Sequence, residues 1–348
     1  MHMADALLSP AAGATFWAGT LAAIAYCSKK LKETMDEKMV PLMGVLGAFI
    51  FAAQMINFTI PATGSSGHLG GGMILSIVLG PYAAFVVMAS VLTVQALFFA
   101  DGGLLALGCN IWNLGIYPCF IAYPLIYKPL AGSGATSGRI TAAAMISGVV
   151  GLQLGAFSVV LQTLLSGRSE LPFNTFVLLM QPIHLGIGIV EGFVTAGVIN
   201  FIKSARPEII ESAFSTRPIA AGVSLRNVLV GLSVAALLTG GTLSWFASAN
   251  PDGLEWSIEK TFGKPELPEQ PQGITHSLKR VQEATSFLPD YSFRKTGEKT
   301  ESAGAGEKAE VWPNVESGKS LSGMVGSGIV IGMILLIGFS IKAVKKKT

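Results

Sequence analysis

The sequence predicts an all-α protein that crosses a membrane several times. Hydrophobic residues make up 51% of its 348 residues, another 41 are glycine, and only 13% are charged, against about 25% in soluble domains. Its mean hydropathy is +0.57. Such a chain has too few polar side chains to cover itself in water, and a net charge of +3 does not fit a nucleic-acid binder. The three cysteines lie in apolar runs, so no disulfide framework is predicted.

Nine membrane-spanning segments are expected from the apolar runs, because a spanning helix needs about 20 such residues. The run 72–99 is too long for one helix, and Gly80-Pro81 is expected to divide it into two short ones. The expected spans are 7–27, 39–58, 72–80, 81–99, 103–127, 139–165, 173–203, 227–249 and 323–343.

The basic residues predict a multi-pass protein of the inner or plasma membrane, with its N-terminus outside and its C-terminus cytoplasmic. Nine spans place 14 of the 24 Lys and Arg on the cytoplasmic side and only Arg168 in a short outside loop. The other nine lie in the long outside segment 250–322, which the positive-inside rule discounts. The first segment lacks the basic start of a signal peptide, so we expect it to be retained.

Three regions are expected along the chain. Residues 1–209 are predicted to form a glycine-rich bundle of seven spans, and residues 210–226 a cytoplasmic connector. Residues 227–348 are predicted to form two helices that bracket the outside segment 250–322. The stretch 263–271 is rich in proline and charge, so we expect much of the outside segment to be extended or mobile.

The sequence carries no signature of an ATPase or a soluble hydrolase. It has no G-x-x-x-x-G-K-[ST], no H-E-x-x-H and no G-x-S-x-G, so neither ATP hydrolysis nor a bound cofactor is expected. Polar side chains within the predicted spans or near their ends are better clues, because they are costly in a membrane. These residues are Gln54, Asn57, Gln95, Asp101, Asn110, Asn113, Gln153, Gln181, His184 and Glu191.

His2 is the strongest indication of a metal site. The Met1 amine, the deprotonated His2 amide and the His2 ring nitrogen nearest the backbone can chelate one divalent ion, and a fourth nitrogen would complete the square plane that Ni²⁺ and Cu²⁺ prefer. His68 is the expected fourth donor, because it lies on the same membrane face among glycines that permit close approach. The alternatives are a chance histidine at position 2 and a loop histidine bonded to a carbonyl at position 68.

Two further histidines have weaker patterns. His184 and Glu191 are seven residues apart on one helix face, which fits either a packed histidine or a buried His–Glu pair with a proton-linked role. His276 is expected to be a solvated surface residue.

The first predicted helix carries small residues at four-residue spacing. Such faces let helices approach closely. They serve either internal packing or the docking of a partner membrane subunit. The residues on this face are Ala14, Ala18 and Ala22.

Four motifs, in this order and at this spacing, resemble the CbiM/NikM family, the substrate-capture (S) components of energy-coupling-factor importers for cobalt and nickel. Another block, Asn250–Trp256, resembles the PDGLE segment of the small auxiliary subunit of these importers, CbiN/NikN. The resemblance covers nearly the whole chain and is weakest over 265–322. The four motifs are MHMADALLSP at residues 1–10, QMINFTIP at 54–61, GSSGHLGGG at 64–72 and QALFFADGG at 95–103.

The resemblance implies a seven-helix component whose metal is bound by Met1, His2 and His68. Other polar residues would fix these ligands or the loop, as metal sites generally require. The candidates for this role are Gln54, Asn57, Asp101 and Asn113. The resemblance also implies partners in the lipid membrane, namely a transmembrane coupling (T) subunit and two cytoplasmic ATPase subunits.

The sequence therefore predicts the metal-capturing component of an importer for Ni²⁺ or Co²⁺, with nickel slightly favoured by four-nitrogen ligation. The metal would be cargo and not a cofactor. One alternative is a membrane-embedded metalloenzyme that uses His68, His184 and Glu191. The other is a sensor or assembly scaffold in which segment 250–322 recruits a partner.

Overall fold

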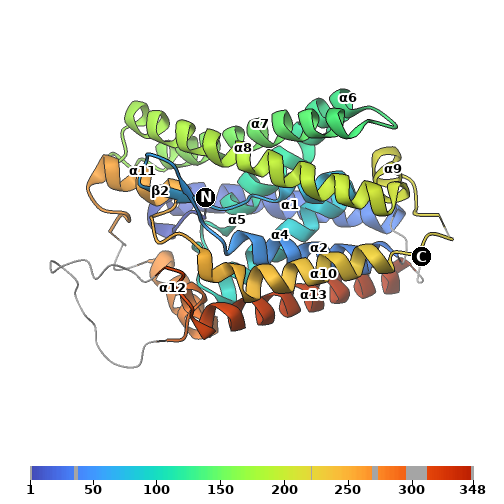
Figure 1. Ribbon diagram of the computed structural model, residues 1–348. Helices are drawn as coiled ribbons and strands as arrows, with labels where there is room; N and C mark the ends of the chain where they lie inside the picture. Colours follow the sequence, from blue (N-terminus) through green and yellow to red (C-terminus); the bar gives the residue numbers. More distant parts are fainter. Residues whose placement is uncertain (1, 35–37, 221, 269–272, 295–311, 346–348) are drawn as a thin grey trace.

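The protein is described here by a computed structural model, which covers residues 2–34, 38–220, 222–268, 273–294 and 312–345. It is built almost entirely of helices (Figure 1). The α-helices are α1 (Pro10–Thr34), α2 (Met39–Gln54), α3 (Gly72–Leu79), α4 (Pro81–Phe98), α5 (Leu107–Ile111), α6 (Lys128–Ala131), α7 (Ser137–Leu165), α8 (Phe173–Ala205), α9 (Pro207–Ser215), α10 (Arg226–Gly241), α11 (Gly253–Phe262), α12 (Ile274–Thr285) and α13 (Ser317–Lys345).

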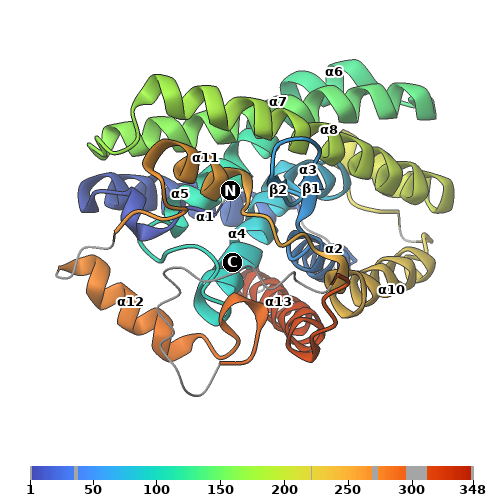
Figure 2. The same cartoon turned by 60° about the vertical axis from the view of Figure 1, so that its left-hand side comes forward.

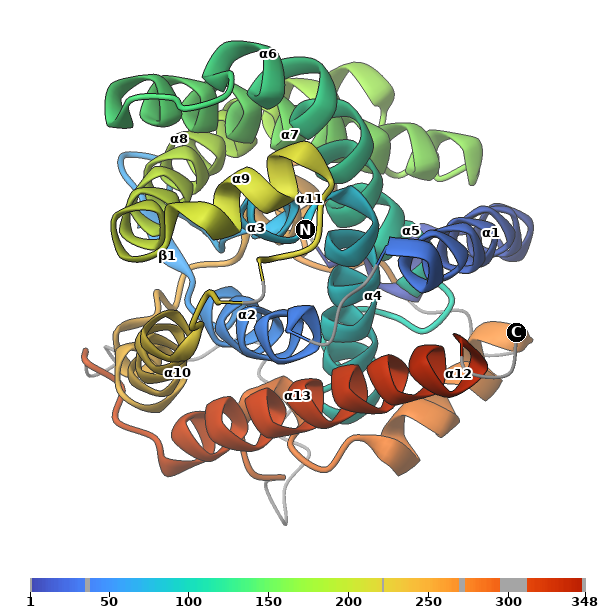
Figure 3. The same cartoon turned by 90° about the vertical axis from the view of Figure 1, so that its right-hand side faces the viewer.

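The long helices lie side by side along one axis, with α11 and α12 at one end of the molecule and α6 and α9 at the other (Figure 1). Helix α7 packs against α8, and α2 contacts α4, α10 and α13. Figure 3 shows α2 with α10 on one side and α13 below it. The segments that the basic residues assign to the cytoplasm and to the outside thus lie at opposite ends, while the sidedness itself stays a prediction.

The fold is that of an all-α polytopic membrane protein, as the composition predicts. Four of the described helices are long and apolar enough to cross a membrane, and two apolar helices, α2 and α10, are shorter. The four long helices are Pro81–Phe98, Ser137–Leu165, Phe173–Ala205 and Ser317–Ala343. Between α5 and α6, Trp112–Tyr127 winds as a π-helix that contains Pro118 and Pro124, which lack the amide hydrogen of a regular turn.

The helix break at Gly80-Pro81 is present, but the expected span 72–80 is not a complete crossing. Gly80 has φ 78°, and Pro81 is the first residue of α4. Helix α3 has eight residues, all of them buried, and at 1.5 Å per residue it is about 12 Å long, against about 30 Å of hydrocarbon. The chain before α3 dips into the bundle as a loop instead.

The expected span 39–58 is too long, because α2 ends at Gln54 and the chain then turns into a hairpin. Strand β1 (Phe58–Ile60) pairs antiparallel with β2 (Ser65–Gly67). Gly64 in the connecting turn has φ 73°, a conformation that glycine adopts readily. The spans expected at 103–127 and 227–249 also differ, with helix beginning at Leu107 and α10 ending at Gly241.

The outside segment is more regular than its composition predicts. It contains α11 and α12, and a 3₁₀ turn follows at Pro289–Tyr291. Asp252 caps α11 by accepting hydrogen bonds from the amides of Leu254 and Glu255, and the Glu255 carboxylate accepts one from the Asp252 amide at 3.0 Å. Residues 263–268 are non-helical as expected, and 269–271 lie outside the described residues.

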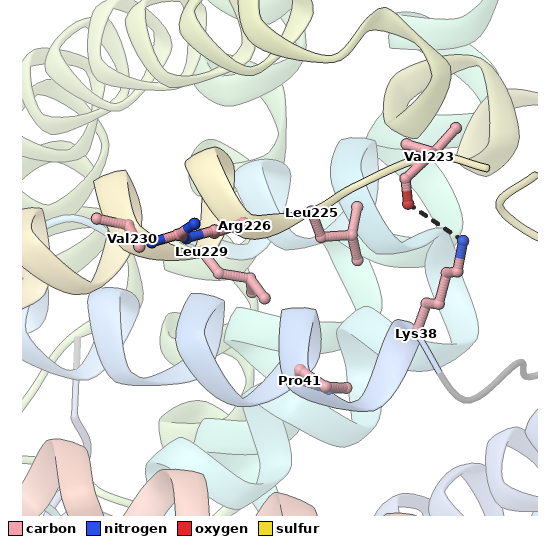
Figure 4. Close-up of a pocket in the computed structure, with 7 residues that line it drawn as sticks. All are labelled: Lys38, Pro41, Val223, Leu225, Arg226, Leu229 and Val230. Carbon is pink, nitrogen blue, oxygen red and sulfur yellow. Dashed lines mark hydrogen bonds between the residues drawn. The ribbon is translucent and has the colours of Figure 1, made fainter. Parts of the chain in front are cut away.

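A hollow of about 570 Å³ lies between the starts of α2 and α10 (Figure 4). The Lys38 ammonium donates hydrogen bonds to the carbonyls of Ala220 and Val223 at 2.8 and 3.1 Å, which ties the connector to α2. Two cations, Lys38 and Arg226, line the hollow together with apolar side chains. This charge does not suit a metal cation.

Candidate metal centre

The segment before α1 is inserted into the bundle. The Met3 side chain is fully buried, and its amide donates a hydrogen bond to Asn110 Oδ1 at 2.8 Å. The Met3 carbonyl accepts hydrogen bonds from the Gly103 amide at 3.0 Å and from Asn110 Nδ2 at 3.2 Å. Asp5 Oδ1 accepts one from the Ala106 amide at 2.9 Å. These contacts fix residue 2 at the mouth of the bundle.

His2 and His68 come together there, 66 positions apart in the sequence. Their imidazole rings are stacked, with centroids 4.8 Å apart and planes 11° apart. The side chain of His2 is 6% exposed, and His68 is 8% exposed. Met1, the third ligand that the family resemblance implies, lies outside the described residues.

Asp101 holds the His2 ring. His2 Nδ1 lies 2.9 Å from Asp101 Oδ1, and the Tyr291 hydroxyl donates a hydrogen bond to Asp101 Oδ2. Burial alone would raise the pKa of the Asp101 carboxyl, but its interactions with His2 and Tyr291 hold that pKa at about 2. The nitrogen expected to chelate, Nδ1, thus faces Asp101 in this structure.

The Nε2 atom of His2 is buried and has no hydrogen-bond partner in the described part of the chain. The His68 ring is oriented by its own segment, with Nδ1 3.0 Å from the Leu69 carbonyl. With Nδ1–H as the donor, the lone pair is on Nε2, as a metal-binding histidine requires. Burial lowers the pKa of His68 to about 3, so its ring is neutral at pH 7 and can act as a ligand without losing a proton.

Glu191 and Gln54 hold the loop that carries His68. The Glu191 carboxylate accepts hydrogen bonds from the amides of Gly70 and Gly71 at 2.9 and 3.0 Å, and Gln54 Nε2 donates one to the Gly70 carbonyl at 2.8 Å. Buried peptide groups need such partners. The buried His–Glu pair considered from the sequence is absent, because Nδ1 of His184 lies 2.8 Å from the Met180 carbonyl.

A small pocket lies beside the His68 ring. It measures about 10 Å³, about the space of one water or one ion. His68, His184 and Asp252 are among its lining residues. Within the described residues Nε2 of His184 has no hydrogen-bond partner. His184 thus presents a lone pair near the candidate ligand His68.

The remaining predicted residues take varied positions. Asn113 exchanges hydrogen bonds with Gln162 at 2.9 Å and its Nδ2 reaches Met3 Sδ at 3.7 Å, whereas Asn57 contributes its carbonyl, which accepts from the Ser248 amide at 2.7 Å. His276 is exposed on α12. Ala14, Ala18 and Ala22 are exposed on α1 and do not pack inside the bundle.

The 250–256 block docks directly on the site, which the sequence does not reveal. Ser66 in β2 donates hydrogen bonds from its amide to the Pro251 carbonyl at 2.8 Å and from its hydroxyl to the Asn250 carbonyl at 2.7 Å. Figure 2 shows α11 beside the hairpin. Burial alone would raise the pKa of Asp252. The groups around it, His68 and His184 among them, outweigh burial, so the pKa is lowered.

No three His, Cys, Asp or Glu side chains of the described chain are arranged to hold a metal ion by themselves.

The family model for CbiM, described as "Cobalt uptake substrate-specific transmembrane region", matches residues 2–209, more than half of the sequence. The chain belongs to the CbiM family. The model of the PDGLE domain matches residues 226–343, so the 250–256 block falls in a second, fused domain.

Two relatives of this CbiM-family chain have names that describe the same fusion of two domains. A protein of Archaeoglobus fulgidus named "Putative fused nickel transport protein NikMN" is 36% identical over 242 residues, 69% of this chain and 79% of its own. "Fused nickel transport protein NikMN" of Rhodobacter capsulatus is 29% identical over 310 residues, 84% and 88% of the two chains. A crystal structure of a transition metal transporter is 31% identical with a TM-score of 0.52, covering 62% of this chain and 98% of that one.

Proposed function

We propose that this membrane metal-transport component captures Ni²⁺, with Co²⁺ as the alternative, and releases it to the cytoplasm within an importer driven by separate ATPase subunits. The ligands would be the Met1 amine, the His2 amide, the His2 ring and the His68 ring. The observation that carries the proposal is the pair of buried, stacked imidazoles of His2 and His68.

The proposed donor set favours nickel. Four nitrogens from a short chelating segment and one loop histidine suit a square-planar d⁸ ion, whereas oxygen-rich sites suit Mg²⁺, Ca²⁺ and Mn²⁺. Two relatives with the same fused layout are named as nickel transport proteins. The family model is named for cobalt uptake, and five- or six-coordinate Co²⁺ would need further donors, for which Asp101 and His184 are close.

The proposed coupling to a T subunit and two ATPases rests on the family resemblance, and the lack of a nucleotide-binding phosphate loop in this sequence agrees with it. The exposed face of α1 that carries Ala14, Ala18 and Ala22 is the surface we assign to the coupling subunit, because small side chains let a partner helix approach closely. The metalloenzyme alternative is not favoured, because Glu191 is committed to the loop amides.

The terminal amine gives the most direct test of this function. Adding an uncleaved residue before Met1 removes that amine, and elemental analysis of the purified protein should then find metal content near zero after desalting. Protein that starts at Met1 should retain about one equivalent. Equal metal content in the two forms would exclude the chelate.

The loop ligand is tested by His68→Ala, with His276→Ala as the matched control on the exposed helix α12. Loss of one of four ligands should weaken binding by at least about 100-fold, since even supporting residues of metal sites contribute 10–100-fold. The control should have the same affinity as the unaltered protein in the same titration. Equal affinities of the two variants would remove His68 from the site.

A further inference from the structure

A second, larger cavity lies directly outside the candidate metal centre. It has a volume of about 540 Å³. One wall is formed by the first residues of the chain and by residues 100–103, and the facing wall by α11, α12 and the turn that follows α12. The cavity therefore exists only because the fused domain folds over the mouth of the bundle.

The walls of this cavity are strongly acidic, with seven Asp or Glu against two Lys or Arg. These carboxylates are close enough to perturb one another. Burial, together with the charge of Asp252, raises the pKa of Glu255 to about 7. Burial raises the pKa of Asp290 as well, with further contributions from Asp101 and Glu266. A cation between these groups would relieve their repulsion.

Two other features show that the cavity leads to the metal centre. His2 lines it with a side chain that is only 6% exposed, and Nε2 of that ring has no partner in the described residues. Asp252 lines both this cavity and the small pocket that contains His68 and His184. One carboxylate of the fused domain thus borders both compartments.

We propose that this cavity is an antechamber that holds a hydrated divalent cation on carboxylates of the fused domain, and that Asp252 passes the ion to the nitrogens at His2 and His68. The inference rests on the proposed function, because it supplies the route by which the captured metal arrives.

The chemistry of the two compartments gives the transfer a direction. Carboxylate oxygens bind hydrated divalent ions loosely and exchange them quickly, whereas nitrogen donors bind Ni²⁺ more tightly. A cleft lined by one sign of charge concentrates counter-ions and raises association rates by about 10- to 1,000-fold, an effect that salt suppresses. The antechamber would therefore act on the rate of capture more than on its final affinity.

The kinetic test uses the full-length protein with Glu255→Gln, Glu266→Gln and Asp290→Asn combined. The amide at 255 can still accept the Asp252 amide hydrogen, and asparagine tolerates the left-handed backbone of residue 290 (φ 50°). Glu170→Gln, an exposed residue outside the cavity, is the matched control. The triple variant should bind Ni²⁺ at least about tenfold more slowly at low salt, and this difference should shrink as salt is added.

A second measurement detects the held cation directly. Mn²⁺ prefers oxygen ligands, so protein already loaded with one Ni²⁺ should bind one additional Mn²⁺ weakly, as counted by electron paramagnetic resonance. The triple variant should lose this Mn²⁺ while it still retains Ni²⁺. His68→Ala should keep the Mn²⁺ although its Ni²⁺ binding is impaired.

The results separate failure of the antechamber from failure of the capture site. Triple-variant kinetics equal to those of Glu170→Gln, or no extra Mn²⁺ on the Ni²⁺-loaded protein, would overturn the antechamber and leave the capture site standing. Absence of tight Ni²⁺ binding by the unaltered protein would instead overturn the proposed function.

Discussion

Three buried polar side chains, Glu191, Gln54 and Asn110, form hydrogen bonds with irregular backbone near the candidate metal centre. Glu191, near the middle of α8, accepts two loop amides, and Gln54 donates to a loop carbonyl. Asn110 binds both the amide and the carbonyl of Met3. The peptide groups of the Met3 segment and of the His68 loop have no helical hydrogen bonds, so these side chains supply their partners. The two candidate ligands are thereby held close together.

Glu191→Gln should loosen this loop. A glutamine has one oxygen acceptor, and its NH₂ group would face an amide hydrogen of Gly70 or Gly71. One buried donor left without a partner costs about 1–3 kcal/mol, so thermal unfolding should occur at a lower temperature and Ni²⁺ should bind more weakly. Glu208→Gln, at an exposed position at the start of α9, is the control. Identical melting and binding of the two variants would contradict the assigned role of Glu191.

Metal affinity should fall in acid. Capture requires the Met1 amine and the His2 amide to give up protons, so each proton released makes the apparent affinity about tenfold weaker per pH unit as the pH falls. His68 adds little to this dependence above about pH 4, because burial already holds its pKa at about 3. Isothermal titration between pH 6 and 8 measures the slope. A flat profile would mean that no nitrogen is deprotonated on binding.

The sequence predicts His2, His68 and Asp101 because each lies in a motif with its own chemistry. It does not predict the roles of Asp252, Asn110 and Tyr291. Tyr291 touches Asp101 only because the segment after α12 folds across the mouth of the bundle. Contacts between residues about 190 positions apart leave no local pattern in the chain.

At the scale of elements, hydropathy finds the long helices and misses the departures from them. The hairpin β1–β2 and the half-length α3 both lie in or next to apolar runs, so a search for spans of about 20 residues extends across them. For the outside segment, the composition underestimates the amount of helix. Its polar composition suggests an extended chain, yet the capping box of Asp252 and Glu255 starts a regular helix there.

The position of α11 depends on Gly253. A Cβ added to this residue would lie 2.6 Å from Ile183 Cγ2 and 3.2 Å from His184 Cε1, so the alanine variant should push α11 away from α8. Amide hydrogen exchange in α11 should accelerate, and Ni²⁺ should bind more slowly as the antechamber opens.

Gly197→Ala provides the matched control for this variant. Gly197 also lies in α8, and an added Cβ meets nothing within 4 Å. Its exchange and binding should match those of the unaltered protein. Unchanged exchange in the Gly253→Ala variant would show that the contact with α8 does not determine where α11 lies.

At the scale of the whole molecule, the fused domain packs against the bundle and against the candidate metal centre. Its helices α10 and α13 pack closely on α2. Gly326 of α13 touches Phe51 of α2, because a Cβ added to this glycine would lie 2.1 Å from the ring. Such small residues permit close approach of helices in a membrane. Its outer segment supplies Tyr291 to Asp101 and the Pro251 carbonyl to Ser66. The domain therefore supports both the His2 side and the His68 side of the site.

X-ray absorption at the nickel edge of the desalted, Ni²⁺-loaded protein is the most direct test of capture by chain-end nitrogens. The predicted spectrum is that of a square-planar ion with four nitrogen donors, and it should disappear when one residue is added before Met1. A six-coordinate, oxygen-rich spectrum that persists after this extension would show that carboxylates such as Asp101 hold the metal, and would contradict the account.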